Sequence, residues 1–124
     1  MRIILADQHA QSRWALKTVL QEETEFDLVG VVEDEHSLMM LAENHKVDLI
    51  LIDRQLPGSP LEDLLDSLHA HDPRPVVIVM SSESEYSRMV LKAGADAFVS
   101  KSDRPDWLLE TLHRYEQRVR NEGK

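Results

Sequence analysis

Four polar residues that could act together chemically stand at or just after the ends of apolar runs. They are Asp7, Asp53, Ser81 and Lys101. Carboxylates hold Mg²⁺ in a hard oxygen site, whereas an ammonium group and a hydroxyl can bind phosphoryl oxygens. A carboxylate can also act as the nucleophile that forms an aspartyl phosphate. The four residue types therefore suit a site for a divalent cation and a phosphoryl group.

Each of these residues also has a simpler interpretation when it is taken alone. Asp7 and Asp53 could cap helices or turns, Ser81 could begin a turn, and Lys101 could be solvated. For any single residue the simpler interpretation is the stronger one. The chemical hypothesis therefore depends on a fold that brings all four side chains together.

The elements that must position these residues follow from five apolar runs that alternate with segments of helical periodicity. The runs predict strands at about 2–7, 27–33, 47–53, 75–81 and 96–100. The periodic segments predict helices at about 9–23, 35–45, 60–71, 84–93 and 104–120. Strict alternation of this kind indicates an α/β fold, with a parallel sheet covered by helices on both faces. We expect one domain over residues 1–120 and a flexible tail at 121–124.

Such a sheet would gather the four side chains at one edge. In open α/β sheets, ligands bind beyond the carboxyl ends of the strands, where each of the four residues stands. Neither a G-x-G-x-x-G nor a G-x-x-x-x-G-K-[ST] pattern occurs, so a nucleotide site is disfavoured.

Composition excludes several other classes of protein. The 124 residues are 42% hydrophobic and 30% charged, which is ample material for one globular core. The absence of Cys excludes disulfides and thiolate metal sites. No apolar run is long enough to span a bilayer, and a net charge of −9 argues against nucleic-acid binding by this chain alone. A cytoplasmic location is the default expectation.

Four segments of the chain resemble the receiver domain of bacterial two-component response regulators. They are ILADQH (4–9), DLILIDRQLPG (48–58), VVIVMS (76–81) and AGADAFVSK (93–101). The chain is most similar to the branch whose receivers are usually joined to helix-turn-helix output domains, and the resemblance covers residues 1–118. It implies a flavodoxin-like, doubly wound sheet of five parallel strands in the order 2-1-3-4-5, with five helices.

The resemblance also implies a role for each site residue. Asp53 matches the phosphoacceptor, Lys101 the phosphate-contacting lysine, and Ser81 the hydroxyl that moves toward the phosphoryl group. Phe98 matches the aromatic that rotates with this movement. Asp7 matches an acid that positions Mg²⁺, and the backbone carbonyl of Gln55 matches a further metal ligand. Gln55 and Glu83 stand at positions that tune phosphoryl lifetime.

One departure from the family concerns Gln8, which stands where receivers usually supply a carboxylate ligand. A neutral amide keeps an oxygen but removes one charge, so we expect weak Mg²⁺ binding, with Gln8 a weak ligand or none. A second departure is that no output domain follows the last helix of the sequence. An output role would then need a partner or a longer parent chain.

The sequence is compatible with two main functions. The first is a signalling switch that is phosphorylated on Asp53 by a histidine kinase or phosphotransfer protein and read through residues 84–120. The second is a pseudo-receiver that binds its partner without phosphorylation, because Gln8 damages the metal site. A small flavodoxin-like ligand-binding domain is a more distant alternative. In the first case the protein is not an enzyme, beyond accepting a phosphoryl group and slowly releasing it, and it could pair as a homodimer.

Several residues outside the four allow narrower expectations. Trp14 faces away from the apolar side of its helix, next to the surface where receivers dock their phosphodonors, so it is a candidate docking residue. Trp107 is expected to be partly in the core, and the six histidines are expected to be solvated. The role of Arg54 stays open. The Lys101–Ser102 peptide is expected to be cis, because the family often has a cis proline there.

Overall fold

The computed structural model describes residues 1–122, and its centre is a sheet of five parallel strands. The strands are β1 (Arg2–Ala6), β2 (Asp27–Val32), β3 (Leu49–Asp53), β4 (Val76–Ser81) and β5 (Ala97–Ser100). Their spatial order is β2-β1-β3-β4-β5, as the family resemblance predicts. β3, the middle strand, is buried along its whole length.

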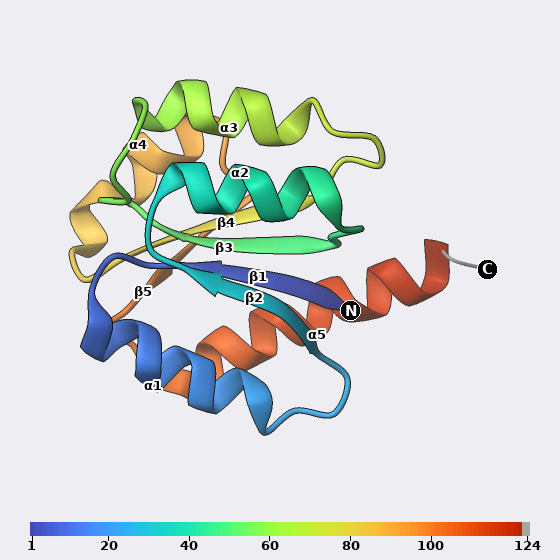
Figure 1. The fold of residues 1–124 in the computed structure, drawn as a ribbon. Coiled ribbons are helices and arrows are strands. Elements are labelled where there is room, and N and C mark those ends of the chain that lie inside the picture. Colours follow the sequence, from blue (N-terminus) through green and yellow to red (C-terminus); the bar gives the residue numbers. More distant parts are fainter. Residues whose placement is uncertain (123–124) are drawn as a thin grey trace.

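The helices cover both faces of this sheet (Figure 1). They are α1 (Ala10–Gln21), α2 (Glu35–Asn44), α3 (Leu61–His69), α4 (Ser87–Lys92) and α5 (Pro105–Glu122). α1 and α5 lie on one face, and α2, α3 and α4 lie on the other. The predicted α/β architecture is therefore confirmed, and element boundaries lie within about two residues of those expected except at the start of α4, which begins three residues later.

Alternation along the strands divides the core into two layers, because successive side chains point to opposite faces of a sheet. The layer under α2, α3 and α4 contains Ile4, Ile50, Ile52, Val77 and Val79, together with leucines of those helices. The layer under α1 and α5 contains Ile3, Leu5, Leu49, Leu51, Ile78 and Met80, together with Leu20, Leu108 and Leu112. The apolar strands are thus buried on both faces of the sheet, and this packing fixes the positions of the polar residues at their carboxyl ends.

Three details differ from the sequence-based expectations. The predicted helix at 84–93 is divided into a 3₁₀ turn, η1 (Ser84–Tyr86), and the short helix α4, because the Ser81 hydroxyl accepts the Glu83 N–H and keeps the chain tightly turned before α4 begins. Trp107 is 53% exposed, since Leu108 and Leu112 occupy the face of α5 against the sheet. The Lys101–Ser102 peptide is trans, because Asp72–Pro73 is the sole cis bond among residues 1–122.

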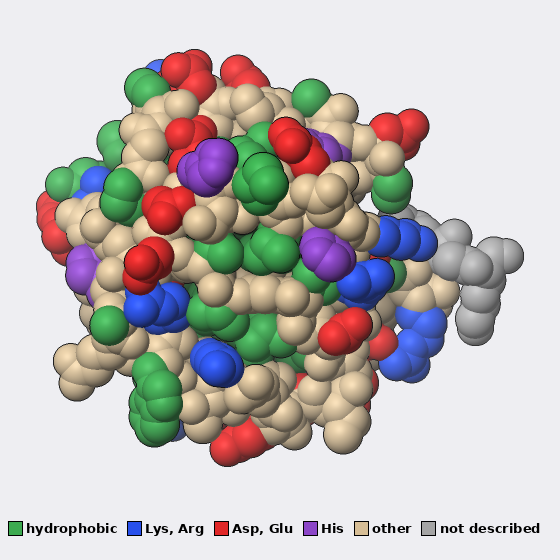
Figure 2. All heavy atoms as spheres, in the orientation of Figure 1, with side chains coloured by type: hydrophobic (Ala, Val, Ile, Leu, Met, Phe, Trp, Pro, Cys, Tyr) green, Lys and Arg blue, Asp and Glu red, His purple; other side chains and the backbone are tan. Residues whose placement is uncertain are grey.

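The end of the chain bears on the expected domain boundary. α5 continues through Glu122, whereas the expected tail at 121–124 lies partly outside the described residues, so that boundary stays a prediction. Within residues 1–122 no helix has the length and apolar character needed to cross a membrane. Acidic, basic and apolar side chains are interspersed over the face seen in Figure 2.

Candidate functional site

The structure brings together all four residues that the sequence singles out. β1 and β3 are neighbours, with Ala6 paired to Ile52, so Asp7 and Asp53 stand side by side at the carboxyl ends of the two strands. Both acids are almost completely buried, at 0% and 3% exposure. Ser81 ends β4 and is also buried. Such burial is unusual for carboxylates unless they are paired or bind an ion.

Lys101 is the cation that compensates these two acids. Its Nζ lies 2.8 Å from Asp7 Oδ2 and 3.1 Å from Asp53 Oδ1. The backbone N–H of Lys101 donates to the Ser81 carbonyl at 2.8 Å, which extends the β4–β5 ladder by one step. The sheet therefore fixes where the lysine leaves the backbone, and its side chain reaches across to both carboxylates.

Asp7 is held ionised by its surroundings. Burial of the carboxylate raises its pKa, but this effect is outweighed by hydrogen bonds from Lys101, Ser12 and the His9 backbone N–H, with the Lys101 charge adding to them. The Ser12 hydroxyl donates to Oδ2 at 2.6 Å, and the His9 N–H donates to Oδ1 at 2.9 Å. The pKa of Asp7 therefore lies below its ordinary value of 3.8.

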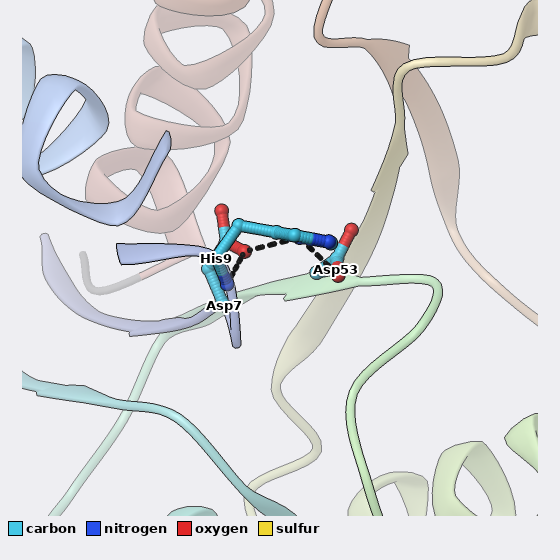
Figure 3. A group of neighbouring side chains, drawn as sticks. All are labelled: Asp7, His9 and Asp53. Carbon is cyan, nitrogen blue, oxygen red and sulfur yellow. Dashed lines mark hydrogen bonds and ion pairs between the residues drawn. The ribbon is translucent and has the colours of Figure 1, made fainter. Parts of the chain in front are cut away.

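His9 is a site residue that the sequence-based reasoning missed. Its Nδ1 lies 3.4 Å from Asp7 Oδ1 and 3.3 Å from Asp53 Oδ2, so the ring bridges the two carboxylates (Figure 3). The His9 side chain is still 51% exposed, whereas the expectation of a solvated side chain is wrong for His69, whose largely buried ring contacts Asp96 at 2.9 Å. A signal for His9 was present in the sequence, since it lies two residues after Asp7, at the point where α1 begins.

One oxygen of Asp53 is left without a hydrogen bond. In the described part of the chain no donor is aligned with Asp53 Oδ2, although that atom is buried. A buried acceptor without a partner costs about 1–3 kcal/mol, and a bound ion would remove this cost. Asp7, His9 and Asp53 each offer one ligand atom, and these atoms lie within 4.8 Å of one another. The donor set therefore fits a divalent cation.

The two glutamines of the site are placed differently. Gln55 lines the cavity beside Asp53, where its backbone could supply the expected carbonyl ligand. Neither Gln8 nor Asp7 belongs to the lining of that cavity, and within residues 1–122 the Gln8 side chain forms no hydrogen bond. Weak or absent ligation by Gln8 therefore stays a prediction.

Ser81 and Arg54 form the side of the site that faces α4. The Ser81 hydroxyl accepts the Glu83 N–H at 3.1 Å, and Arg54 Nε lies 3.5 Å from the same oxygen. The Arg54 guanidinium is stacked on the Tyr86 ring, with 3.6 Å from Cζ to the ring centre. The Arg54 side chain therefore does not point freely into solvent but packs against Tyr86 and Ser81.

A cavity of about 500 Å³ lies over the site, between the strand ends, α1 and α5. Asp53, Ser81 and Lys101 line its polar part, and Leu16 and Leu108 belong to its apolar wall. A phosphoryl group and its donor can therefore approach Asp53 from solvent. Outside the cavity lining, Trp14 is 69% exposed on α1, as expected, and Phe98 packs against the core layer under α2, α3 and α4.

Comparisons with known proteins agree with this fold. The nitrate/nitrite response regulator NarL of Escherichia coli K12 is 33% identical over 113 residues, which are 90% of this chain and 52% of NarL. The chain thus spans about half the length of the curated relatives it matches. A CheY-like receiver domain protein of Methanospirillum hungatei superposes with a TM-score of 0.80 at 27% identity, over 98% of this chain and 97% of that one. The receiver domain of AraT from Geobacillus stearothermophilus gives 0.84 at 21% identity, over 99% and 98%.

The family model provides the assignment. Residues 3–113 match the response regulator receiver domain, and this range contains the acidic pair, the lysine and the buried serine described above. The chain belongs to the receiver-domain family of response regulators.

Proposed function

We propose that this receiver domain is a phosphoryl-accepting switch, and that Asp53 takes its phosphoryl group from the phosphohistidine of a histidine kinase or phosphotransfer protein. The observation that carries the proposal is the buried Asp53 carboxylate, with Lys101 Nζ 3.1 Å from Oδ1, at the floor of an open cavity. Asp53 Oδ1 is proposed to attack phosphorus in line, forming the O–P bond as the N–P bond breaks. The imidazole leaves with the electron pair of that bond and takes up a proton.

The residues around Asp53 have separate roles in this step. Asp7 and Asp53, with the Gln55 carbonyl, would hold Mg²⁺, which neutralises negative charge on the transferring group. Lys101 is proposed to shift its contact from Asp53 Oδ1 to a phosphoryl oxygen. Gln55 and Glu83 line the cavity beside Asp53 and are proposed to set how long the phosphoryl group persists.

The conformational response is proposed to begin at Ser81. Its hydroxyl now accepts the Glu83 N–H and lies near Arg54, and it would turn to donate to a phosphoryl oxygen. That movement breaks contacts that hold η1 and the stacked Tyr86 ring in place. Phe98, in β5, would rotate with Ser81, and a partner would read the altered α4-β5-α5 surface.

The experiment that tests this proposal is phosphorylation by a small donor. The protein is incubated with acetyl phosphate and Mg²⁺, and its intact mass is measured. We expect the mass of one phosphoryl group to be gained by the wild type and by Asp103→Asn, whose side chain is exposed at the rim of the same cavity. Asp53→Asn should gain none. Equal labelling of Asp53→Asn would exclude Asp53 as the acceptor.

A pseudo-receiver is the second candidate, and the neutral Gln8 at a position where receivers usually have a carboxylate favours it. If the missing carboxylate abolishes metal binding, the domain would bind partners without phosphorylation. Gln8→Asp distinguishes the two functions, because it restores the charge that the family usually has. Phosphorylation of both proteins, faster in Gln8→Asp, supports the switch with weakened Mg²⁺ binding. Labelling of Gln8→Asp alone would establish the pseudo-receiver.

The cellular setting is proposed from the family. We infer a cytoplasmic protein whose output depends on a partner or on a fused domain in a longer parent chain, with a homodimer as one form of the active state. The acidic net charge supports the inference that this domain does not itself bind nucleic acid. Trp14, exposed on α1 beside the cavity, is proposed to contact the phosphodonor.

A further inference from the structure

His9 stands where an ion would bind between the two acids. Its Nδ1 is 3.4 Å from Asp7 Oδ1 and 3.3 Å from Asp53 Oδ2. The second of these oxygens is the buried acceptor that no described donor satisfies. Asp53 Oδ2, which lacks a hydrogen-bond partner, and His9 Nδ1 therefore lie next to each other.

The distances from His9 Nδ1 to the two carboxylate oxygens match those between neighbouring ligand atoms of one bound metal ion. With metal–ligand bonds of about 2.0–2.2 Å and angles between octahedral and tetrahedral, adjacent ligand atoms lie about 2.8–3.6 Å apart. The two distances from His9 Nδ1 fall inside this range, and all three ligand atoms lie within 4.8 Å of one another. A metal could therefore be bound by small side-chain adjustments alone.

The backbone of His9 is fixed before any metal arrives. Its N–H donates to Asp7 Oδ1 at 2.9 Å, and its carbonyl accepts the Arg13 N–H at 2.8 Å in the first turn of α1. His9 is the N-cap residue of that helix, yet its side chain makes no capping bond. The ring is thus held near the carboxylates and is not occupied by a structural role.

The other potential ligands of the site carry too little negative charge to bind Mg²⁺ tightly. Gln8 replaces the carboxylate that receivers usually supply, so the site has one anionic ligand fewer. Mg²⁺ and Mn²⁺ both favour carboxylate oxygens, but the first-row transition ions, Mn²⁺ included, accept an imidazole nitrogen more readily than Mg²⁺ does. Replacing one carboxylate by one imidazole therefore moves the preference of the site away from Mg²⁺.

We propose that His9 is a direct metal ligand and that, with Asp7 and Asp53, it makes this site selective for a transition ion such as Mn²⁺ over Mg²⁺. The inference depends on the metal site of the proposed function, but it does not require that phosphorylation occur. In this proposal, the His9 imidazole replaces the carboxylate ligand that Gln8 cannot supply.

The first test is a spin-echo measurement on the full chain with stoichiometric Mn²⁺ and no phosphodonor. Modulation from a directly coordinated ¹⁴N nucleus is expected in the wild type. It should vanish in His9→Ala and persist in His36→Ala, which removes an exposed histidine of α2. Absence of nitrogen modulation in the wild type, or its persistence in His9→Ala, would overturn the proposal, as would failure of the wild type to bind Mn²⁺.

The second test measures selectivity by calorimetric titration. The wild type should bind Mn²⁺ at least about tenfold more tightly than Mg²⁺, and His9→Ala should lose most of that difference. Equal preference in the wild type and His9→Ala would contradict the assignment. Because both readouts are binding measurements, a protein that takes up Mn²⁺ through His9 but is never phosphorylated supports this inference while refuting the proposed function.

Discussion

The molecule has two aspartate–histidine pairs at opposite ends of its sheet, and they are built differently. At the amino end, Asp96 Oδ2 accepts the Val77 N–H at 2.8 Å and lies 2.9 Å from His69 Nε2, so its hydrogen bonds are made. At the carboxyl end, His9 Nδ1 lies 3.3–3.4 Å from Asp7 and Asp53, and Asp53 Oδ2 has no described donor. Asp96 is satisfied by the fold, whereas Asp53 keeps one acceptor, Oδ2, available for a ligand.

The difference teaches how to separate structural from functional acids in this fold. Asp96 joins α3, β4 and β5, because its side chain bonds to two elements and its own N–H donates to the Val77 carbonyl. The Asp53 side chain has two close contacts, 3.1 Å to Lys101 Nζ and 3.3 Å to His9 Nδ1, and its Oδ2 has no aligned donor in the described part of the chain. Among the acids compared, only Asp53 keeps a buried carboxylate oxygen without a described hydrogen bond, although Arg2 Nε at the amino end of β1 is also buried without a hydrogen-bond partner.

Removing one acid from each end should produce opposite results, and this is the largest expected effect. Asp53→Ala should abolish phosphorylation while lowering the free energy of unfolding by no more than about 1 kcal/mol, because Lys101 keeps Asp7 as its partner. Asp96→Ala should leave phosphorylation intact but cost about 1–3 kcal/mol, because the Val77 N–H loses its acceptor. Urea unfolding and intact mass check both, and a shared loss of stability would break the distinction.

The cations of the two ends should also differ. Lys101→Ala leaves two buried carboxylates without compensation and should lower the free energy of unfolding by about 2–4 kcal/mol at neutral pH. Arg74→Ala removes an exposed guanidinium 3.4 Å from Asp96 and should cost less than about 1 kcal/mol. Adding Asp53→Asn to Lys101→Ala should recover part of the loss. No recovery would mean that buried charge is not the reason.

The acid dependence of stability provides a third contrast. Because the pKa of Asp7 is lower in the folded state than its ordinary 3.8, the ionised carboxylate stabilises the fold above that pH. This stabilisation should be lost as the pH falls from about 3.8 through the lower folded-state pKa. Denaturant titrations across this range should give a steeper decline for the wild type than for Asp7→Asn. Parallel declines would show that Asp7 contributes no pH-dependent stability.

The smallest expected effect concerns the surface beside the functional end. Trp14→Ala should leave the melting temperature nearly unchanged, because the side chain is 69% exposed, yet weaken binding to the cognate phosphodonor protein by about 1–2 kcal/mol. Trp107→Ala, which removes an exposed tryptophan of α5, is the matched control. Equal weakening by both substitutions would argue against a specific contact at Trp14.

The strand ends explain what could be predicted from the sequence. Asp7, Asp53, Ser81 and Lys101 were found because apolar runs fix where strands end, and parallel strands end at one edge. His9 and Arg54 were not assigned, because their roles depend on side-chain rotations that periodicity does not encode. Trp107 was placed wrongly, since it is adjacent to core positions of α5 and only packing decides which neighbours are buried.

The central claim is that Asp53 itself carries the phosphoryl group, and reductive trapping tests it most directly. The protein is treated with acetyl phosphate and a divalent cation, reduced with borohydride, which converts an aspartyl phosphate to homoserine, and digested for peptide mass analysis. The account predicts homoserine at position 53, with aspartate unchanged at positions 7 and 96. Homoserine elsewhere, or unmodified Asp53 under saturating donor and cation, would contradict it.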